Sequence, residues 1–316
     1  MTEAFRITAP GNILLLGEYA VTEPGGLGLA LGTGPRGVLA AEPAATFTVR
    51  AKMGSQMVQW PEQAIPLVNA GVEVMCERRM KLPKLSITLD TSAFFGAGRK
   101  LGFGSSASAA VLLAAAMVTP TLPHETGFAS ILELALAIHR RLQDGRGSGY
   151  DVAASTFGGL LRFSGGTRPA PEPVELPWIP PLYALPAAEA VATKGAIRSY
   201  TRWKRDHPHE ATDFLRRSNE TVDLFLQSDS WAEAKPMLLR AKALGEELGN
   251  AIGVPADFRL SRDAEADAVE RNGSVAKAVG AGGEMGVLFA ADETALREVK
   301  ESAVKLNLRE RGVSWE

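Results

Sequence analysis

The chain has 316 residues, of which 46% are hydrophobic and 22% charged, and its formal net charge is −2. This length is sufficient for two domains with separate cores, and the composition is typical of a globular protein rather than a disordered one. A nucleic-acid-binding protein normally carries a basic excess, which is absent here. A small anionic ligand is not excluded, because a few local cations suffice to bind one.

The chain contains one cysteine, Cys76, which excludes an internal disulfide and a metal site built on paired cysteines. We expect Cys76 to be a small buried apolar side chain. No signal peptide is predicted, because the N-terminal residues lack a basic stretch followed by a long apolar core. The longest apolar run, near Ala107–Val118, is too short to cross a bilayer. We therefore expect a cytoplasmic protein that does not associate with membranes.

The first half of the chain alternates between strand and helix patterns. Strands are predicted at Arg6–Ala9 and Ile13–Leu16, on either side of a break at Pro10-Gly11, and then at Leu27–Ala40, Thr46–Lys52, Lys84–Leu89 and Gly159–Phe163. Helical patterns occur at Ile65–Met80, Ala107–Val118, Ala129–Leu142 and Asp151–Phe157. The helix at Ala107–Val118 is nearly all apolar, which is typical of a helix that is buried on all sides.

A change of composition divides the chain. Six prolines fall within Gly165–Pro181, which predicts a boundary between domains at 1–165 and 166–316. Beyond it, strands are predicted at Leu182–Leu185, Glu189–Thr193, Val275–Val279, Gly286–Ala290 and Gly312–Trp315, and helices at Thr212–Gln227, Ser230–Gly249, Pro255–Arg271 and Glu293–Lys305. The sequence therefore predicts an α/β protein in two halves.

The segment from Lys100 to Ala110 has the pattern of a phosphate-binding loop. Glycine lets the backbone approach a ligand closely, and serine at a helix start favours the exposed amides that attract phosphate. Ser105 or Ser106 can offer a hydroxyl to Mg²⁺. The Gly-Lys-Ser/Thr ending of a Walker A loop is missing. The alternative is a plain glycine loop that caps a buried helix.

Three segments resemble the motifs of the GHMP kinases, the superfamily of galactokinase, homoserine kinase, mevalonate kinase and phosphomevalonate kinase. Gly102–Ser108 resembles the ATP-binding signature, and Ala9–Val21 and Lys277–Gly286 resemble the N-terminal and C-terminal motifs. The resemblance implies an N-terminal domain like ribosomal protein S5 domain 2, a C-terminal ferredoxin-like domain, and ATP and Mg²⁺ as cofactors. The ATP-binding residues that it implies are Lys100, Gly102, Gly104, Ser105, Ser106, Ala107 and Ser108.

Asp151 follows a second glycine-rich turn and stands at a helix start. A carboxylate there can accept a proton from an attacking hydroxyl or orient it, or it can simply cap the helix. Residue type alone does not decide between these roles. The matching aspartate belongs to the active site in mevalonate and phosphomevalonate kinases, so the resemblance implies that Asp151 is catalytic. The position matching the magnesium-binding glutamate of mevalonate kinases is Arg140, so that ligand is absent.

Several segments resemble the phosphomevalonate kinase branch, among them Gln143–Val152 and Thr193–Ser199. The acceptor-binding residues that this implies are Lys194, Arg198, Ser199, Ser148, Gly280, Ala281 and Gly282. Lys194 and Arg198 can hold an acceptor phosphate, the arginine by a bidentate fork. The alternative is ordinary surface charge near a helix start. The four histidines are scattered along the sequence, and we assign them no metal role.

The sequence departs from the family pattern at Asn12, where these kinases usually have lysine or arginine. A cation there stabilises charge on the moving phosphoryl group. We expect Asn12 to lie in the catalytic site, with Arg146 as the first choice and Lys100 as the second for the replacement cation. The leading hypothesis is a monomeric or homodimeric kinase for a small molecule, with phosphomevalonate as first candidate. A kinase for mevalonate or a sugar, or a catalytically weak nucleotide-binding or metabolite-binding protein, is the alternative.

Overall fold

The computed structural model describes residues 3–96, 99–119, 127–145, 147–166, 169–186, 193–254, 273–280, 285–291 and 303–316, with the backbone alone at 186, 193 and 194. The chain folds into two compact units. The first contains residues 1–13, 31–159 and 308–316, and the second contains 14–30 and 160–307. The units therefore exchange segments, whereas the predicted domains are two continuous stretches that meet at residue 165. That domain division stays a prediction.

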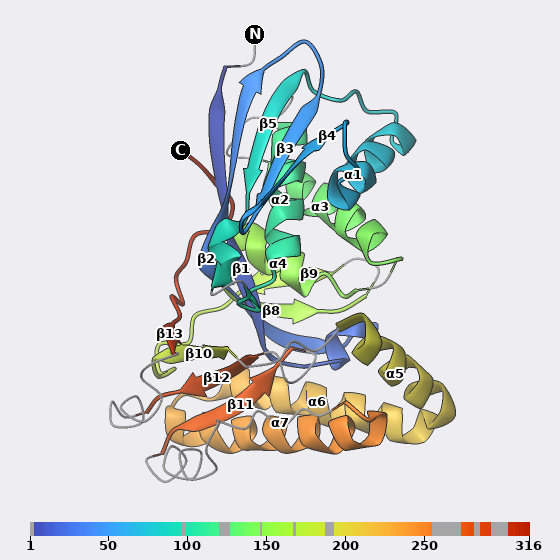
Figure 1. Cartoon of the computed structure of the whole chain (residues 1–316). Coiled ribbons are helices and arrows are strands. Elements are labelled where there is room, and N and C mark those ends of the chain that lie inside the picture. The colour runs from blue at the N-terminus through green and yellow to red at the C-terminus, as the bar shows by residue number, and fades with distance from the viewer. Residues whose placement is uncertain are drawn as a thin grey trace. The chain divides into compact units, whose positions relative to one another are not determined.

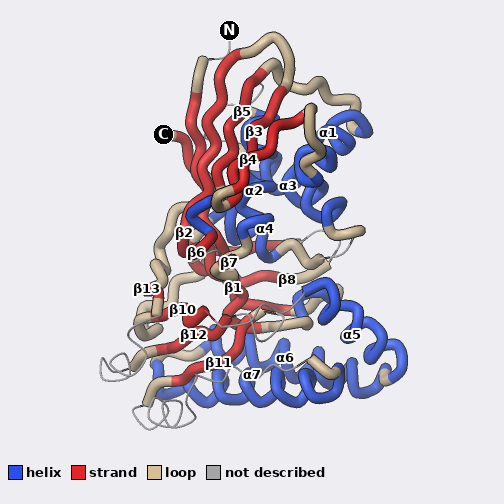
Figure 2. The backbone as a smooth tube through the Cα atoms, viewed as in Figure 1, coloured by secondary structure: helices blue, strands red, loops and turns tan. Residues whose placement is uncertain are grey.

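The first unit is built on a mixed sheet (Figures 1 and 2). Its strands are β1 (Phe5–Leu16), β2 (Leu27–Pro43), β3 (Thr48–Met53), β4 (Gln56–Trp60), β5 (Leu85–Asp90) and β14 (Ser314–Trp315). Their order is β14-β1-β2-β5-β3-β4. β5 runs antiparallel to β2 and parallel to β3. Along β5, Leu85, Ile87 and Leu89 are buried and alternate with more exposed residues, as expected of a strand with one face on the core.

Four helices accompany this sheet: α1 (Pro66–Glu77), α2 (Ser105–Val118), α3 (Phe128–Leu142) and α4 (Tyr150–Phe157). In Figure 1, α1, α2 and α3 lie together on one face of the sheet. Every residue of α2 from Ala107 to Val118 is buried. The prediction of a fully buried helix is confirmed, because this helix packs against the sheet and against its neighbouring helices.

Two expectations for the first unit are wrong. β1 is continuous through Pro10-Gly11, where a break was expected. The strand passes beneath the glycine-rich loop, and the Asn12 amide donates to Phe103 O at 3.0 Å, so the loop pairs with the strand at this point. Cys76 is exposed rather than buried. The buried face of α1 includes Val68 and Met75, and the next residue after Met75 turns away from it because successive helical residues are about 100° apart.

Two short antiparallel pairs include strands that the sequence did not predict. β6 (Phe95–Gly96) pairs with β7 (Arg99–Lys100) just before the phosphate-loop segment. β8 (Gly159–Ser164) confirms the strand predicted at Gly159–Phe163, and it pairs with β9 (Ala170–Pro173), an unpredicted strand in the proline-rich segment. Proline is tolerated in such a strand at a sheet edge, where its missing N–H is not required for pairing.

The second unit has a four-stranded antiparallel sheet with helices beside it (Figure 1). The strands are β10 (Leu182–Pro186), β11 (Val275–Val279), β12 (Met285–Phe289) and β13 (Val304–Lys305), in the order β11-β12-β10-β13. The helices are α5 (Thr193–Asp206), α6 (Pro208–Gln227) and α7 (Trp231–Ile252). A hydrophobic core between these helices includes Tyr19, Tyr200, Phe214 and Leu248.

The remaining predictions for this unit have mixed outcomes. β11 has the bounds expected from the sequence, whereas Thr193 begins a helix instead of ending a strand. The helix predicted at 255–271 lies outside the described residues, as does most of the one predicted at 293–305, whose last two residues form β13. Among the helices that the structure describes, none is both long and apolar enough to cross a membrane.

Arg36 fixes the C-terminal segment within the first unit. Its guanidinium donates to Glu310 at 2.7 Å, to Gly312 O at 2.8 Å and to Thr8 Oγ1 at 2.9 Å. The Arg36 side chain is 24% exposed and that of Glu310 is 21% exposed, so the pair is largely shielded from water. A charged fork with several partners is worth more than an isolated surface pair.

Candidate active site

The loop before α2 has the backbone geometry of an anion cradle. Gly102 and Gly104 both have positive φ, +82° and +65°, which glycine adopts without strain. A Cβ on Gly104 would lie 2.3 Å from Asn12 Nδ2, so no other residue fits there. In the described part of the chain, no side chain caps the start of α2. The first amides of this helix are therefore available to an anion.

The structure separates the serines of this loop into two kinds. Ser106 is exposed and Ser105 is partly exposed, so both hydroxyls are accessible to a ligand. Ser108 is buried and donates to Ala9 O at 2.9 Å, which ties α2 to β1. Ala107 is also fully buried, and Lys100 is exposed on β7. The assignment of all these residues to ATP binding stays a prediction, and the geometry favours Ser105 and Ser106 as hydroxyl ligands.

Asn12 is buried beneath the loop, with 3% of its surface exposed. Its Nδ2 donates to Ser155 Oγ at 3.1 Å and to Gly104 O at 3.4 Å. Together with the bond from its backbone amide to Phe103 O, these contacts join the loop to β1 and α4. Asn12 therefore positions the loop, and it brings no net charge to it.

Asp151 lies in the first turn of α4, and its side chain is 20% exposed. The N-cap position of this helix is Gly149, in a left-handed conformation, so Asp151 lies inside the first turn and not at the N-cap position. One carboxylate oxygen accepts from the Val152 amide at 2.9 Å, and the other lies 3.6 Å from His139 Nδ1. A carboxylate in this place is favoured by the helix dipole.

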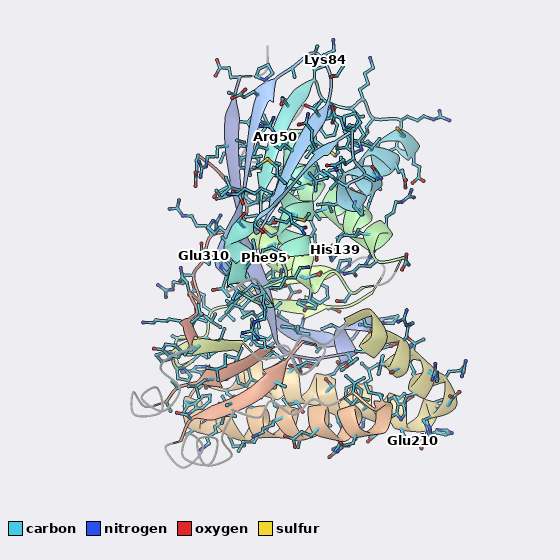
Figure 3. The ribbon with its side chains drawn as sticks, in the orientation of Figure 1. Arg50, Lys84, Phe95, His139, Glu210 and Glu310 are labelled. Carbon is cyan, nitrogen blue, oxygen red and sulfur yellow. The ribbon has the colours of Figure 1, made fainter. Side chains whose placement is uncertain are left out.

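His139 is the site residue that the sequence did not reveal. It lies on α3 (labelled in Figure 3) and is 2% exposed. Its Nε2 lies 3.3 Å from Ser106 Oγ and its Nδ1 faces Asp151. In sequence, Arg140 matches the magnesium-binding glutamate of mevalonate kinases, but the side chain of α3 that faces Asp151 is that of the preceding residue, His139. The available signal was helical periodicity, since His139 continues the buried face of Ile131, Leu134 and Ile138.

The predicted acceptor-binding residues are found in both units. Ser148 belongs to the first unit, where it is buried and its hydroxyl accepts from the Tyr150 amide at 3.5 Å. In the second unit, Arg198 is exposed and Ser199 partly exposed on α5, while Lys194 is described by its backbone alone. Gly280 forms the turn after β11. Arg146, Ala281 and Gly282 lie outside the described residues.

A buried ion pair in the second unit was also not predicted. Lys277 on β11 is 3% exposed, and its ammonium group donates to the Glu18 carboxylate and to Leu15 O at 3.0 Å. Burial raises the pKa of Glu18, and the neighbouring charge of Lys277 opposes that shift. Burial, with the Glu18 charge beside it, raises the pKa of Tyr19 to about 12.

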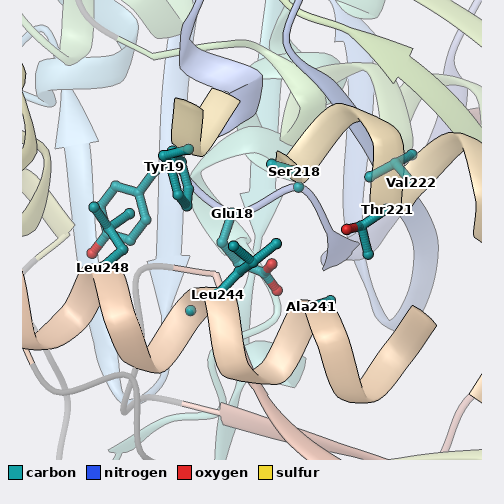
Figure 4. Close-up of a pocket in the computed structure, with 11 residues that line it drawn as sticks. Glu18, Tyr19, Ser218, Thr221, Val222, Ala241, Leu244 and Leu248 are labelled. Carbon is teal, nitrogen blue, oxygen red and sulfur yellow. The ribbon is translucent and has the colours of Figure 1, made fainter. Parts of the chain in front are cut away.

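The segment that carries Glu18 lines a pocket against α6 and α7 (Figure 4). Glu18 and Tyr19 face Leu244 and Leu248 of α7 across it. A neighbouring pocket is lined by Glu18, Lys277 and Gly280, so the second unit brings together residues of the N-terminal and C-terminal motifs. Gly17, at φ +89°, permits the close turn, because a Cβ there would lie 2.1 Å from Leu27 O.

The described residues offer isolated oxygen donors near the loop rather than a cluster of metal ligands. Among the described residues, no group of three or more histidine, cysteine, aspartate or glutamate side chains is placed to hold an ion. The donors beside the loop are the hydroxyls of Ser105 and Ser106 and the carboxylate of Asp151. Mg²⁺ usually keeps several waters and binds through one or two protein groups together with substrate phosphates, and this donor set fits such a mode.

Comparison with known proteins supports the resemblance seen in the motifs. Residues 67–159 match the GHMP kinases N terminal domain family. They contain the loop, His139 and Asp151, and the chain has the two-domain fold of GHMP kinases. Over 187 residues, the chain is 28% identical to the phosphomevalonate kinase of Streptomyces sp. (strain CL190), a match that covers 51% of this chain and 49% of that protein. The chain thus spans about half the length of the curated relatives it matches.

Solved structures are similar over nearly the whole chain. The Lin0012 protein from Listeria innocua has a TM-score of 0.85 at 20% identity, with 99% of both chains covered. Streptococcus pneumoniae phosphomevalonate kinase, in complex with phosphomevalonate and AMPPNP, has a TM-score of 0.79 at 18% identity, with 98% of this chain and 99% of that chain covered. At these identities the likeness establishes the fold. The resemblance to the GHMP superfamily, and within it to phosphomevalonate kinases, is confirmed.

Proposed function

We propose that this chain is an ATP-dependent kinase that phosphorylates phosphomevalonate or a closely related phosphorylated metabolite. The proposal rests on one observation: the side chains of Ser106 and Asp151 both lie next to the buried imidazole of His139. The sequence predicts a role in nucleotide binding for the first residue and in proton transfer for the second. Phosphoryl transfer requires these two functions close together, and positioning is most of what a kinase contributes.

Each residue has a defined task in this proposal. The loop amides at the start of α2 bind the phosphates of ATP, and Ser105 and Ser106 hold Mg²⁺. Bound Mg²⁺ neutralises charge on the nucleotide phosphates. Asp151 accepts the proton of the acceptor hydroxyl as the oxygen forms its bond to the terminal phosphorus and the bond to ADP breaks. The acceptor-side residues, above all Lys194 and Arg198, bind the phosphate that the acceptor already carries.

Similarity to phosphomevalonate kinases supports this acceptor. The Streptomyces relative has that name, and the Streptococcus enzyme was solved in complex with phosphomevalonate and AMPPNP. A kinase for mevalonate or a sugar shares the fold and the loop, and differs in the charge that the acceptor brings. The exposed guanidinium of Arg198 favours an acceptor that already carries a phosphate.

An ATP-consumption assay tests the proposal directly. The wild-type chain is incubated with Mg²⁺ and ATP together with phosphomevalonate, mevalonate, galactose or homoserine, and ADP is measured. We expect turnover with phosphomevalonate to exceed turnover with the others. Preference for an uncharged sugar would overturn the acceptor. Nucleotide binding without turnover of any acceptor would favour the second candidate, a catalytically weak binding protein, which is suggested by the uncharged Asn12 in the place of a lysine.

A further inference from the structure

We propose that His139 is a positioning residue that orients Ser106 and Asp151 at the same time, in one defined tautomer. The inference rests on the proposed function, because it assigns His139 a task in that site. His139 connects three helices: it lies on α3, Ser106 lies in the first turn of α2, and Asp151 lies in the first turn of α4. All three residues belong to the first unit.

Gln143 and Asp151 both favour the same tautomer of His139. Gln143 Nε2 lies 3.4 Å from His139 Nε2, one turn along α3. The other amide atom, Oε1, occupies the space that a Cβ on Gly147 would fill, so the amide presents its nitrogen to the imidazole. An amide nitrogen only donates hydrogen bonds, so the ring nitrogen that it meets must accept. In a neutral imidazole the proton is then on Nδ1, the nitrogen that faces Asp151.

This tautomer has two consequences for the site. With the proton on Nδ1, Nε2 can only accept, so the Ser106 hydroxyl, at 3.3 Å, shares the single Nε2 lone pair with the Gln143 amide and keeps its own oxygen lone pairs for a cation or another donor. The Nδ1–H is directed at Asp151 Oδ2 across 3.6 Å. This is longer than a hydrogen bond, and such contacts commonly shorten once substrate is bound. One ring thus aligns the predicted metal ligand and the predicted base.

Burial makes this ring a suitable positioning element. His139 is 2% exposed, so packing holds the imidazole in one orientation. Ser106, in contrast, is exposed, and a serine hydroxyl rotates freely unless a partner holds it. The imidazole supplies that partner from the protein interior. The nucleotide loop and the base are therefore coupled through a residue that need not touch either substrate.

The tautomer can be measured without any activity. The ¹⁵N shifts and the long-range ¹H–¹⁵N couplings of His139, recorded on the full chain at neutral pH, distinguish a proton on Nδ1 from one on Nε2. We expect the Nδ1-protonated form in the wild type. We expect that form to be less dominant in Gln143→Leu, which removes the amide donor. The Nε2-protonated form in the wild type would overturn the proposal.

Two amide variants separate the two contacts. In His139→Gln the new amide lies near the old Nε2 and retains a partner for Ser106, whereas in His139→Asn it lies near the old Nδ1 and retains one for Asp151. We expect His139→Gln to bind Mg-AMPPNP in calorimetry nearly as the wild type does while kcat falls on the order of 10²-fold. His139→Asn should weaken Mg-AMPPNP binding more than it lowers kcat. The control is His209→Gln, at an exposed histidine of α6.

The outcomes separate this inference from the proposed function. Turnover is measured with phosphomevalonate, or with whichever acceptor of the panel the wild type uses. Normal kcat in His139→Gln, alongside loss of activity in Asp151→Asn, would overturn the positioning role and leave the proposed function standing. Equal losses of binding and turnover in both amide variants would also overturn the positioning role. If the wild type turned over no acceptor, the proposed function would fail, and the tautomer and the two Mg-AMPPNP affinities would still decide the inference.

Discussion

Replacing Lys277 with methionine tests the buried ion pair of the second unit. Methionine is unbranched and of similar length, so the change removes the charge with little change of volume. Lys277 is 3% exposed, and its ammonium group donates to Glu18 and to Leu15 O. Removing one partner of a buried pair costs about 3–5 kcal/mol. We expect a loss near about 3 kcal/mol, because Glu18 can take up a proton and so escape part of the penalty.

The loss should depend on pH with a definite sign. Burial raises the pKa of Glu18 in the folded protein, and the charge of Lys277 opposes that shift. Without Lys277 the pKa of Glu18 rises further above its unfolded value. A carboxyl with a raised folded pKa stabilises the folded state below its unfolded pKa, and that contribution is lost as the pH rises through the folded pKa. Lys277→Met should therefore lose more stability at about pH 8 than at about pH 5.

Urea unfolding followed by tryptophan fluorescence measures both effects. Three proteins are compared with the wild type at each pH: Lys277→Met, the double variant Glu18→Gln/Lys277→Met, and the control Lys305→Met, at an exposed lysine of the same unit. The double variant has no buried charge, so it should recover part of the loss and lose the pH dependence. The control should stay within about 0.5 kcal/mol of the wild type. Equal effects of Lys277→Met and the control, or a loss independent of pH, would refute the reasoning.

Three further changes test the first unit. Ser106→Tyr places a bulky ring at the start of α2, so Mg-ATP binding should disappear in calorimetry; unchanged affinity would exclude this loop as the nucleotide site. Asp151→Asn keeps the shape and removes the base, so turnover should fall on the order of 10²–10⁴-fold with ATP affinity retained; near-normal turnover would make this carboxylate structural. Arg36→Leu should lower the unfolding free energy by about 2 kcal/mol, against about 0–1 kcal/mol for the exposed pair of Arg6; equal losses would contradict the shielded fork.

The sequence predicted those helices and strands whose own residue composition indicates how they are buried. α2 is apolar along its length, and such a sequence is stable only if it is covered on several sides. The bounds of β11 follow from a short apolar run ended by a glycine turn. Composition also pointed to a boundary near the proline-rich segment, but β9 lies within it. There, pairing with β8 outweighs the low strand propensity of proline.

Contacts between distant residues were not predictable in this way. Glu18 and Lys277 are 259 positions apart, and neither one specifies its partner. A lysine within the buried run of β11 does carry a general signal, because a buried ammonium group requires an acceptor or an anion. The same holds for His139, which continues a buried helical face and therefore needs polar partners. Such residues can be recognised from the sequence as requiring partners, although the partners come only from the fold.

Asn12 shows how a departure from a family motif can be understood from its neighbours. The space around the Asn12 side chain is closely packed: its amide donates to Ser155 and Gly104, and a Cβ on Gly104 would collide with it. A short neutral amide satisfies these acceptors without burying a charge, which would need a counter-ion. The residue thus serves the shape of the loop rather than its electrostatics. If transfer occurs at this site, its charge must be stabilised by the loop amides, by the bound cation and by a basic side chain brought from elsewhere in the chain.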